Sequence, residues 1–457
     1  MVNWITVRLI LVLTAQLGLA TKQVDYTAAF VHADIDLPPN YEHMTKEEKE
    51  RQGVYIEMPR GFKVPGKVLK LKKSLYGLKQ SPRNFFMHLK ANLERAGFTQ
   101  AVDVDPCLFI SDKVICLTYV DDCIMVSDKA ENIDKVISRL RDVQNMQLEE
   151  EDDVAGFLGV HIERTPNHVK LTQKGLTKRI VETLQIEHLP PVSTPADRVL
   201  GKDLEGEPPY CTFNYASVIG MLWYLYGHSR PDLGFAVSQA ARFAFSPKRS
   251  HELALIRIGQ YLKGTMDKGL IMTPATFDQF HMEVYVDSDF LGLYGGEQRS
   301  DPDNVRSRAG HVILINECPI IWSSRLMTSV ALSTMMAEYY ALSASLREAL
   351  PLRDLVRAVA QGCGLNDSCK TTFKTTVWED NMGALTLAKL EPGHNTTRSK
   401  HFDSKVHWFR SYLRPNEGDP NRTTVEKIES RLQRADIMTK HLPKDTFEFL
   451  RKLLMGW

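Results

Sequence analysis

The sequence predicts a chain of several domains with mixed α+β and α/β architecture. Its 457 residues exceed one ordinary core and fit about two to four domains. Apolar residues make up 43% and charged residues 25%, which is typical of globular proteins and argues against a fibrous or disordered chain. Strand patterns come first and alternate with helical patterns towards the C-terminus, as in a sheet with helices on its faces.

The first twenty residues have two interpretations. Arg8 precedes an apolar stretch that ends in small residues at Ala20, which is the pattern of a secretory signal. Gln16 interrupts this stretch, and a buried helix leading into a strand explains it equally well. Seven scattered cysteines without CxxC or Cys/His zinc spacing favour a reduced, intracellular chain without a structural metal cluster, so we expect no secretion. No later segment approaches 18 uninterrupted apolar residues, so we expect no membrane association.

A local basic stretch is hidden in a nearly neutral chain. The formal net charge is +1, but Gly61–Lys90 contains eight basic residues and no acidic one. Phe62, Tyr76, Phe85 and Phe86 are interleaved with these charges. Such a stretch is typical of a surface that grips phosphates and bases, although a solvated basic face is the plain alternative.

The first half of the chain shows a series of short elements. Apolar residues on both sides of a polar tetrad predict a hairpin over Val114–Val126. A helical period follows over Lys129–Val143, and Glu149–Asp153 has the composition of an acidic loop. Residues 155–171 form a second predicted hairpin.

Prolines divide the rest of the chain. Pro190, Pro191 and Pro195 mark one break, and Pro274 marks another. Between them the pattern is helical, with a helix start at Pro231. The C-terminal part predicts three strands, a long helix, a further strand and a short helix, at Glu283–Val286, Gly310–Asn316, Ile320–Trp322, Ser333–Gln361, Thr375–Trp378 and Met382–Leu390.

One group of carboxylates lies in the first half. Asp25 follows a strand-like segment, and the pair Asp121 and Asp122 lies at the tip of the first predicted hairpin. Adjacent carboxylates repel each other and are costly to bury unless a divalent cation compensates them. Mg²⁺ binds through such carboxylates and substrate phosphates. An ordinary turn is the alternative explanation of the Asp-Asp dipeptide.

A second group lies in the C-terminal half. Asp287, Glu338, Asp380 and Asp436 each stand at a strand end, on a helix or at a helix start. Distant residues in such places can converge on one metal site. Taken singly, each is as easily a helix cap or a surface charge.

Tyr119-Val120-Asp121-Asp122 resembles the catalytic hairpin of reverse transcriptases, and the chain resembles the copia-type (Pseudoviridae) retrotransposon polyprotein over nearly its whole length. Further matching segments are Val24–Phe30, Ser74–Arg83, Phe157–Gly159, Ser193–Pro195 and Tyr261–Thr265. The resemblance implies a reverse-transcriptase palm, an antiparallel sheet with helices, together with partial fingers in residues 1–170. Thumb and connection helices would follow in 171–275, and a ribonuclease H-like α/β domain in 276–457.

For the first site, the resemblance implies that Asp25, Asp121 and Asp122 form a palm triad that holds two Mg²⁺ ions, with Mn²⁺ as an alternative, for nucleotidyl transfer. Phe30 would lie against the sugar 2′ position and favour deoxynucleotides by steric clash. The segment Phe157-Leu158-Gly159 would position the primer end. Residues that would contact nucleotide, template or primer are Tyr76, Gly77, Lys79, Gln80, Arg83 and Tyr119.

For the second site, the resemblance implies that the four C-terminal carboxylates are the ribonuclease H quartet with a second pair of Mg²⁺ ions. Asp289 and Glu379 are near neighbours, but Asp287 and Asp380 fit the family pattern better. Lys400 and His401 would contact nucleic acid. His401 or His407 would help product leave or orient the scissile phosphate, and a structural role is equally open.

The resemblance implies RNA template, DNA primer, RNA/DNA hybrid and dNTPs as partners, other segments of the same polyprotein as neighbours, and a location in cytoplasmic virus-like particles or the nucleus. Two departures matter. The sequence begins about two dozen residues before Asp25, so we expect the usual fingers region ahead of it to be missing. Met335 and Met336 replace small polar residues beside Glu338. The alternative function is therefore a catalytically impaired remnant that binds nucleic acid.

Overall fold

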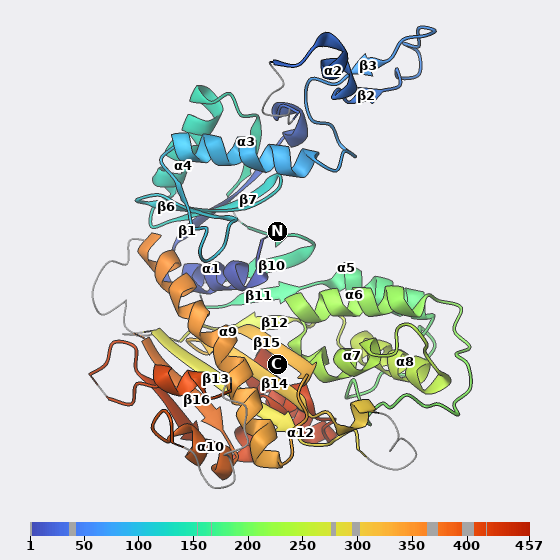
Figure 1. The fold of residues 1–457 in the computed structure, drawn as a ribbon, viewed down its shortest axis with the longest axis vertical. Helices are drawn as coiled ribbons and strands as arrows, with labels where there is room; N and C mark the ends of the chain where they lie inside the picture. The colour runs from blue at the N-terminus through green and yellow to red at the C-terminus, as the bar shows by residue number, and fades with distance from the viewer. Residues whose placement is uncertain are drawn as a thin grey trace. The chain divides into compact units, whose positions relative to one another are not determined.

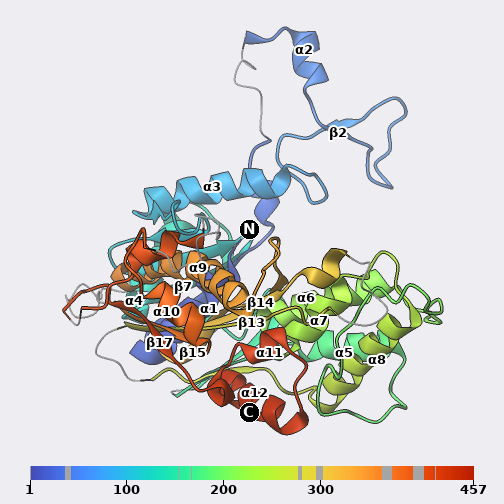
Figure 2. The ribbon, with the colours of Figure 1, turned by 60° about the horizontal axis from the view of Figure 1, so that its bottom comes forward.

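The computed structural model describes residues 2–35, 43–152, 154–165, 167–275, 280–294, 302–362, 373–394, 406–416 and 418–457. The chain is a mixed helix-and-sheet protein with two compact units (Figures 1 and 2). The first unit consists mainly of Leu19–Val154, and the second of Trp4–Gly18, Ala155–Ala360 and the C-terminal residues. In the part of the chain described, no helix is both long and apolar enough to cross a membrane.

The first unit is built on a six-stranded sheet. The strand order is β4-β5-β6-β7-β1-β8, and all neighbouring strands are antiparallel. The hairpin predicted at Val114–Val126 is confirmed as β6 and β7. The strands are β1 (Ala20–Tyr26), β4 (Thr99–Gln100), β5 (Leu108–Ile110), β6 (Val114–Tyr119), β7 (Asp122–Ser127) and β8 (Leu148–Glu151).

Two helices cover one face of this sheet. They are α3 (Ser81–Arg95) and α4 (Ala130–Ser138), which runs on as a π-helical turn at Arg139–Val143 (Figure 1). Apolar side chains recur at helical spacing on both helices and meet alternate residues of the strands in one buried core. Because side chains alternate along a strand, Val24 and Tyr26 enter this core while Asp25 points to the opposite face.

The predicted acidic loop after the helix is a strand instead. Leu148–Glu151 forms β8 and pairs with β1, with Asp25 directly opposite Glu149. Leu148 is buried, whereas the three glutamates of the strand lie at the sheet edge. Pairing with the exposed edge of β1 overrides the poor strand propensity of glutamate.

The basic stretch is largely exposed. A short helix α2 (Lys46–Arg51) precedes a two-stranded ribbon of β2 (Tyr55–Ile56) and β3 (Leu69–Lys70). The helix begins with a capping box between Thr45 and Glu48. A 3₁₀ turn, η1 (Ala29–His32), connects β1 to this segment.

The N-terminal helix α1 (Trp4–Leu17) groups with the second unit. It is a buried helix leading into strand β1, as one reading of the sequence proposed. Arg8 is 4% exposed, and its Nε and Nη1 donate to the carbonyls of Ile320 and Gly227 at 2.8 and 2.9 Å. Its guanidinium lies 4.1 Å from the centre of the Trp322 ring. The sequence predicted that residues 1–170 form the first of three domains. This division into three domains stays a prediction.

A four-stranded sheet and a group of helices form one part of the second unit. The strand order is β12-β11-β10-β9, which joins the predicted 155–171 hairpin to a strand beyond the helices. Helices α5 to α8 pack on one another (Figure 1). The elements are β9 (Gly156–Phe157), β10 (Val160–Arg164), β11 (Val169–Thr172), α5 (Lys174–Leu184), α6 (Tyr215–His228), α7 (Gly234–Ala241), α8 (Arg249–Gly264) and β12 (Leu270–Met272).

The other part of the second unit is a five-stranded sheet of order β15-β14-β13-β16-β17. β13, β14 and β15 are antiparallel neighbours, while β16 runs parallel to β13 and β17 runs parallel to β16. The four strands predicted here are confirmed, each is longer than predicted, and a fifth strand, β17, was not predicted. They are β13 (Phe280–Asp289), β14 (Arg308–Ile315), β15 (Cys318–Leu326), β16 (Phe373–Glu379) and β17 (Thr423–Lys427).

Helices connect and flank these strands. The long helix α9 (Thr334–Gly362) follows β15 and confirms the predicted helix. Short helices follow β16 and β17, where they place polar residues at the ends of the parallel strands. These are α10 (Met382–Ala388), α11 (Asp436–Thr439) and the C-terminal α12 (Lys444–Met455).

Candidate functional sites

The first candidate site lies on the face of the six-stranded sheet opposite α3 and α4. Asp25 on β1 is directly opposite Asp122 on β7, and Tyr119 is paired with Asp122 across the hairpin. Val120 and Asp121 form the two-residue connection between β6 and β7. The amide of Tyr26 donates to the Asp121 carbonyl at 3.0 Å, which ties the hairpin tip to β1. The three sequence-predicted aspartates therefore lie on one small area of sheet.

Val120 has a φ of 54°, in the left-handed region. A β-branched residue avoids this region because its side chain crowds its own backbone. The tight two-residue turn between β6 and β7 imposes this conformation on Val120, and such strained residues cluster at functional sites.

The charges around Asp25 oppose its ionisation. Partial burial, and then the charges of Asp121, Glu149 and Glu151, raise the pKa of Asp25. Burial and the charges of Asp121 and Asp25 likewise raise the pKa of Asp122. Carboxylates at this site therefore gain from a bound cation, although they are not among the potential ligands that converge within 4.8 Å in the described residues.

The residues predicted to contact nucleotide lie around the start of α3. The rings of Phe30 and Tyr76 are 4.6 Å apart, and Tyr76 is 55% exposed. Gly77 has a φ of 94°, a conformation that favours glycine, and Gln80 is the N-cap residue of α3. Lys79 and Arg83 are exposed beside them.

The turn formed by Phe157-Leu158-Gly159 is held within the second unit. Leu158 and Gly159 have φ values of 51° and 73° between β9 and β10. The Tyr224 hydroxyl donates to the Leu158 carbonyl at 2.6 Å. The ring of Trp4 lies 6.4 Å from the ring of Phe157. Helices α1 and α6 therefore position this turn.

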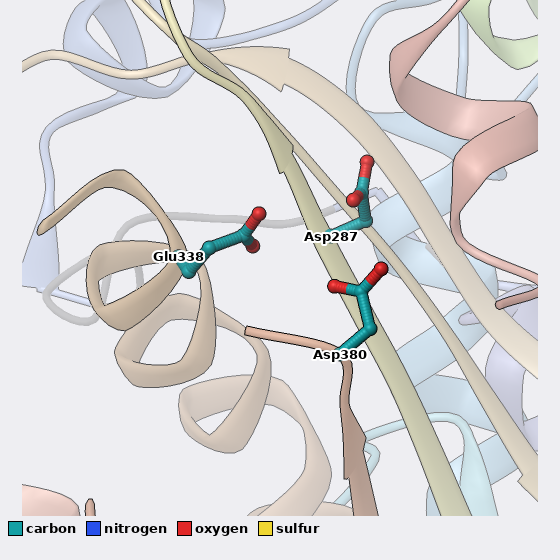
Figure 3. Close-up of side chains that lie close together, drawn as sticks. All are labelled: Asp287, Glu338 and Asp380. Atoms are coloured by element: carbon teal, nitrogen blue, oxygen red, sulfur yellow. The ribbon is translucent and has the colours of Figure 1, made fainter. Parts of the chain in front are cut away.

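The second candidate site lies where the five-stranded sheet meets α9 and α11. Asp287 is near the end of β13, Glu338 is on the second turn of α9, and Asp380 directly follows β16. One potential ligand atom from each lies within 4.8 Å of the others, and Figure 3 shows the three carboxylates turned towards one another. Asp287 is 1% exposed and Glu338 is 4% exposed. Three of the four predicted carboxylates are thus together, two of them buried and Asp380 partly exposed.

The fourth carboxylate, Asp436, joins this group through a lysine. The Lys440 Nζ donates to an oxygen of Asp287 and to an oxygen of Asp436, at 2.9 Å each. The Thr439 hydroxyl donates to the other oxygen of Asp287. Sequence reasoning gave Thr439 and Lys440 no role, although the i,i+4 spacing of Asp436 and Lys440 is a signal for an ion pair.

Electrostatic repulsion at this site is strong. Burial, followed by the charges of Asp287, Glu379 and Asp380, raises the pKa of Glu338 to about 11. Burial and the Asp287 charge raise the pKa of Asp436 to about 7, against the opposing effect of Lys440. Without a divalent cation, Glu338 is therefore protonated at neutral pH.

The neighbouring acids have other roles in the fold. Glu379 is fully buried, accepts a hydrogen bond from the Asn381 amide at 2.9 Å, and has a pKa raised to about 8, mainly by burial. Asp289 lies opposite Arg308 in the β13–β14 ladder. Neither belongs to the group of three that converges in the described residues.

Several polar contacts fix the elements that carry the site. Gln433 Nε2 donates to the Val286 carbonyl at 2.8 Å, next to Asp287. The Ser324 hydroxyl donates to the Met438 carbonyl on α11, and Arg308 Nη1 donates to the same hydroxyl at 3.2 Å. These bonds hold α11, and with it Asp436, against β14 and β15.

His407 lies against α9. Its Nδ1 is 2.9 Å from the Tyr339 hydroxyl, which also accepts from Arg410 Nε at 2.6 Å. The contact ties the segment around His407 to the residue next to Glu338, which fits the structural role that the sequence left open. Lys400 and His401 lie outside the described residues.

Comparison with known proteins shows which family the chain resembles. Residues 1–198 match the family model described as reverse transcriptase (RNA-dependent DNA polymerase). The chain is 30% identical to the retrovirus-related Pol polyprotein from transposon TNT 1-94 of Nicotiana tabacum, over 99% of this chain and 32% of that protein. It is 28% identical to the retrovirus-related Pol polyprotein from transposon RE1 of Arabidopsis thaliana, over 86% of this chain and 26% of that protein. It is 26% identical to the Transposon Ty1-NL2 Gag-Pol polyprotein of Saccharomyces cerevisiae, over 94% of this chain and 23% of that protein.

Residues 1–198 are therefore a segment of the reverse transcriptase class. Over nearly its whole length the chain is similar to the Pol polyproteins of copia-type retrotransposons, as the sequence motifs indicated. It spans 32% or less of the length of the relatives named above.

Proposed function

We propose that this chain carries RNA-directed DNA polymerase activity in its first unit and ribonuclease H activity in its second. The observation that carries the proposal is the convergence of Asp287, Glu338 and Asp380 in a second, buried acidic site beyond the reverse transcriptase segment. A chain that copies RNA into DNA forms an RNA/DNA hybrid, and its RNA strand must then be removed.

The topology supports a ribonuclease H-like domain. Three antiparallel strands continue into two parallel strands, and the carboxylates come from the central β13, the end of β16 and two flanking helices. In the first unit, the antiparallel sheet with α3 and α4 on one face and three aspartates on the other supports a palm. The helices α5 to α8 are the proposed thumb and connection.

The second site fits a hard divalent cation such as Mg²⁺ or Mn²⁺. Its donors are carboxylate oxygens, and the buried Oε2 of Glu338 has no hydrogen-bond partner among the described residues. Asp287, Glu338, Asp380 and Asp436 would hold the metal. When bound, a metal pair supplies an activated water and stabilises the leaving 3′ oxygen.

The residues of the chain prepare this chemistry. The Ser430 hydroxyl donates to Asp380 at 2.9 Å, and Thr439 and Lys440 donate to Asp287, so both carboxylates are oriented before substrate binds. At the first site, Asp25, Asp121 and Asp122 would hold the corresponding metal pair. Phe30 and Tyr76 would contact the incoming dNTP, and Lys79 and Arg83 the template or primer phosphates.

Cleavage of a labelled RNA/DNA hybrid tests the ribonuclease H proposal. We expect Mg²⁺-dependent cleavage, and a loss of at least about 100-fold in Asp380→Asn, because a ligand of the reacting site is removed. Asp354→Asn, an exposed change on α9, is the matched control and should cleave normally. Retained cleavage in Asp380→Asn would show that the site assignment is wrong.

A segment that binds nucleic acid without extending a primer is the second candidate. The observation in its favour is that the first-site aspartates are not among the ligands converging within 4.8 Å in the described residues, while the basic stretch is exposed. Primer extension on an RNA template separates the two. Extension that Asp121→Asn abolishes supports the polymerase, whereas binding without extension supports the second candidate.

A further inference from the structure

Lys440 lies within the second acidic site, in contact with two of its carboxylates. It is the C-cap residue of the short helix α11, and its side chain is 35% exposed. Its ammonium bridges two carboxylates from different elements, Asp287 on β13 and Asp436 on α11. The bridge spans 153 residues of sequence, so the fold itself places a positive charge among the acids.

This arrangement leaves Asp287 fully engaged. One oxygen accepts from Lys440 and the other accepts from the Thr439 hydroxyl. Asp287 is also one of the three residues whose oxygens converge, with Glu338 and Asp380. A divalent ion bound among these three would therefore lie close to the ammonium, and two cations at such short range repel each other.

We propose that Lys440 is a positioning residue that competes with the divalent ion for Asp287, so that the lysine neutralises the metal-free site and withdraws from Asp287 when metal binds. Because the ammonium is partly exposed, it can turn outwards and meet a phosphate of the nucleic-acid backbone. Metal loading is then linked to substrate binding. This inference rests on the proposed function, since it takes the acidic group to be a divalent-metal site.

The test is direct Mn²⁺ binding to the full chain by isothermal titration calorimetry. All proteins carry Asp121→Asn and Asp122→Asn, so that the first site does not contribute. Lys440→Met removes the charge and keeps much of the aliphatic length, and Lys440→Arg keeps the charge. Lys389→Met is the matched control, because Lys389 pairs with Glu426 at a mostly exposed place outside the acidic group.

We expect Lys440→Met to lower the Kd for Mn²⁺ by about tenfold or more. The Kd of Lys440→Arg and that of Lys389→Met should stay close to the Kd of the protein that keeps both lysines. We also expect the thermal midpoint of Lys440→Met in EDTA to be lower than that of the protein with Lys440. Added Mn²⁺ should raise the midpoint of Lys440→Met by more than it raises the midpoint of the protein with Lys440. If Lys440 were purely structural, the Lys440→Met substitution would weaken Mn²⁺ binding. An unchanged or higher Kd in Lys440→Met overturns the inference.

A further variant, Asp380→Asn, distinguishes this failure from failure of the proposed function. If Asp380→Asn weakens Mn²⁺ binding while Lys440→Met changes nothing, the metal site stands and the role of Lys440 is wrong. If no variant binds Mn²⁺, or Asp380→Asn binds it normally, both the metal site and the inference fall. Binding seen only in Lys440→Met supports the inference strongly.

Discussion

Replacing Glu338 by glutamine is expected to stabilise the metal-free protein at pH 7.5. Burial and three nearby carboxylates raise the pKa of Glu338 from 4.5 to about 11. The folded protein therefore holds a proton at pH 7.5 that the unfolded chain releases, and stability falls as the pH rises above 4.5. Glutamine has no such proton, so the variant avoids this loss.

The size of the effect follows from the pH interval. Three pH units separate pH 7.5 from the pKa of 4.5 in the unfolded chain, and each unit is worth about 1.4 kcal/mol. Glu338→Gln should therefore gain on the order of 4 kcal/mol in free energy of unfolding at pH 7.5, and below about 1 kcal/mol at pH 5.0. Added Mg²⁺ should narrow the difference, because it binds the ionised carboxylate of the unsubstituted protein.

Urea unfolding in EDTA, followed by tryptophan fluorescence at both pH values, measures this difference. Glu348→Gln on the same helix is the matched control. Burial opposes the ionisation of Glu348, but the hydrogen bond from His311 and the nearby positive charges together lower its pKa. Its ionised form therefore stabilises the fold at both pH values, and its removal should destabilise. A Glu338→Gln gain that is equal at pH 5.0 and 7.5, or a loss at pH 7.5, would refute the reasoning.

Three further predictions concern other parts of the chain. Arg8→Met leaves the carbonyls of Ile320 and Gly227 without their donor and should cost about 2 kcal/mol, seen as a lower urea midpoint; an unchanged midpoint would contradict the burial argument. Val120→Gly relieves the strained left-handed φ and should match or exceed the original stability by up to about 1 kcal/mol, while primer extension slows because the hairpin tip loosens; a clear drop in thermal midpoint would count against strain at Val120. If the first site is a polymerase, Phe30→Ala should raise ribonucleotide incorporation relative to deoxynucleotide incorporation, measured by primer extension with each, and an unchanged ratio would remove Phe30 from sugar discrimination.

The local elements were predictable because each has a strong pattern of its own. The hairpin around Tyr119–Asp122 is marked by apolar runs on both sides of a polar tetrad, and helix α9 by a stretch rich in Ala, Leu and Glu. The structure confirms both. Strand β8 was missed, because its glutamates disfavour a strand and only pairing with β1 makes it one. The α1 segment was ambiguous, since an apolar stretch of this length fits a signal or a buried helix equally well.

The candidate sites show the same division. Motif order alone pointed to Asp287, Glu338 and Asp380 and preferred them over Asp289 and Glu379, and these three are the residues that converge. Their catalytic roles stay a proposal.

Family membership and the identity of the acidic residues could therefore be read from the chain, because both depend on residue types in a fixed order. The contacts of Lys440 and Thr439 with Asp287 could not, since side chains about 150 residues apart meet only through the packing of α11 against β13. The raised pKa of Glu338 is also a product of the fold, because desolvation and repulsion depend on distance and burial. The sequence showed a nearly neutral chain with one local basic stretch, and folding brought carboxylates from distant segments together in two acidic sites.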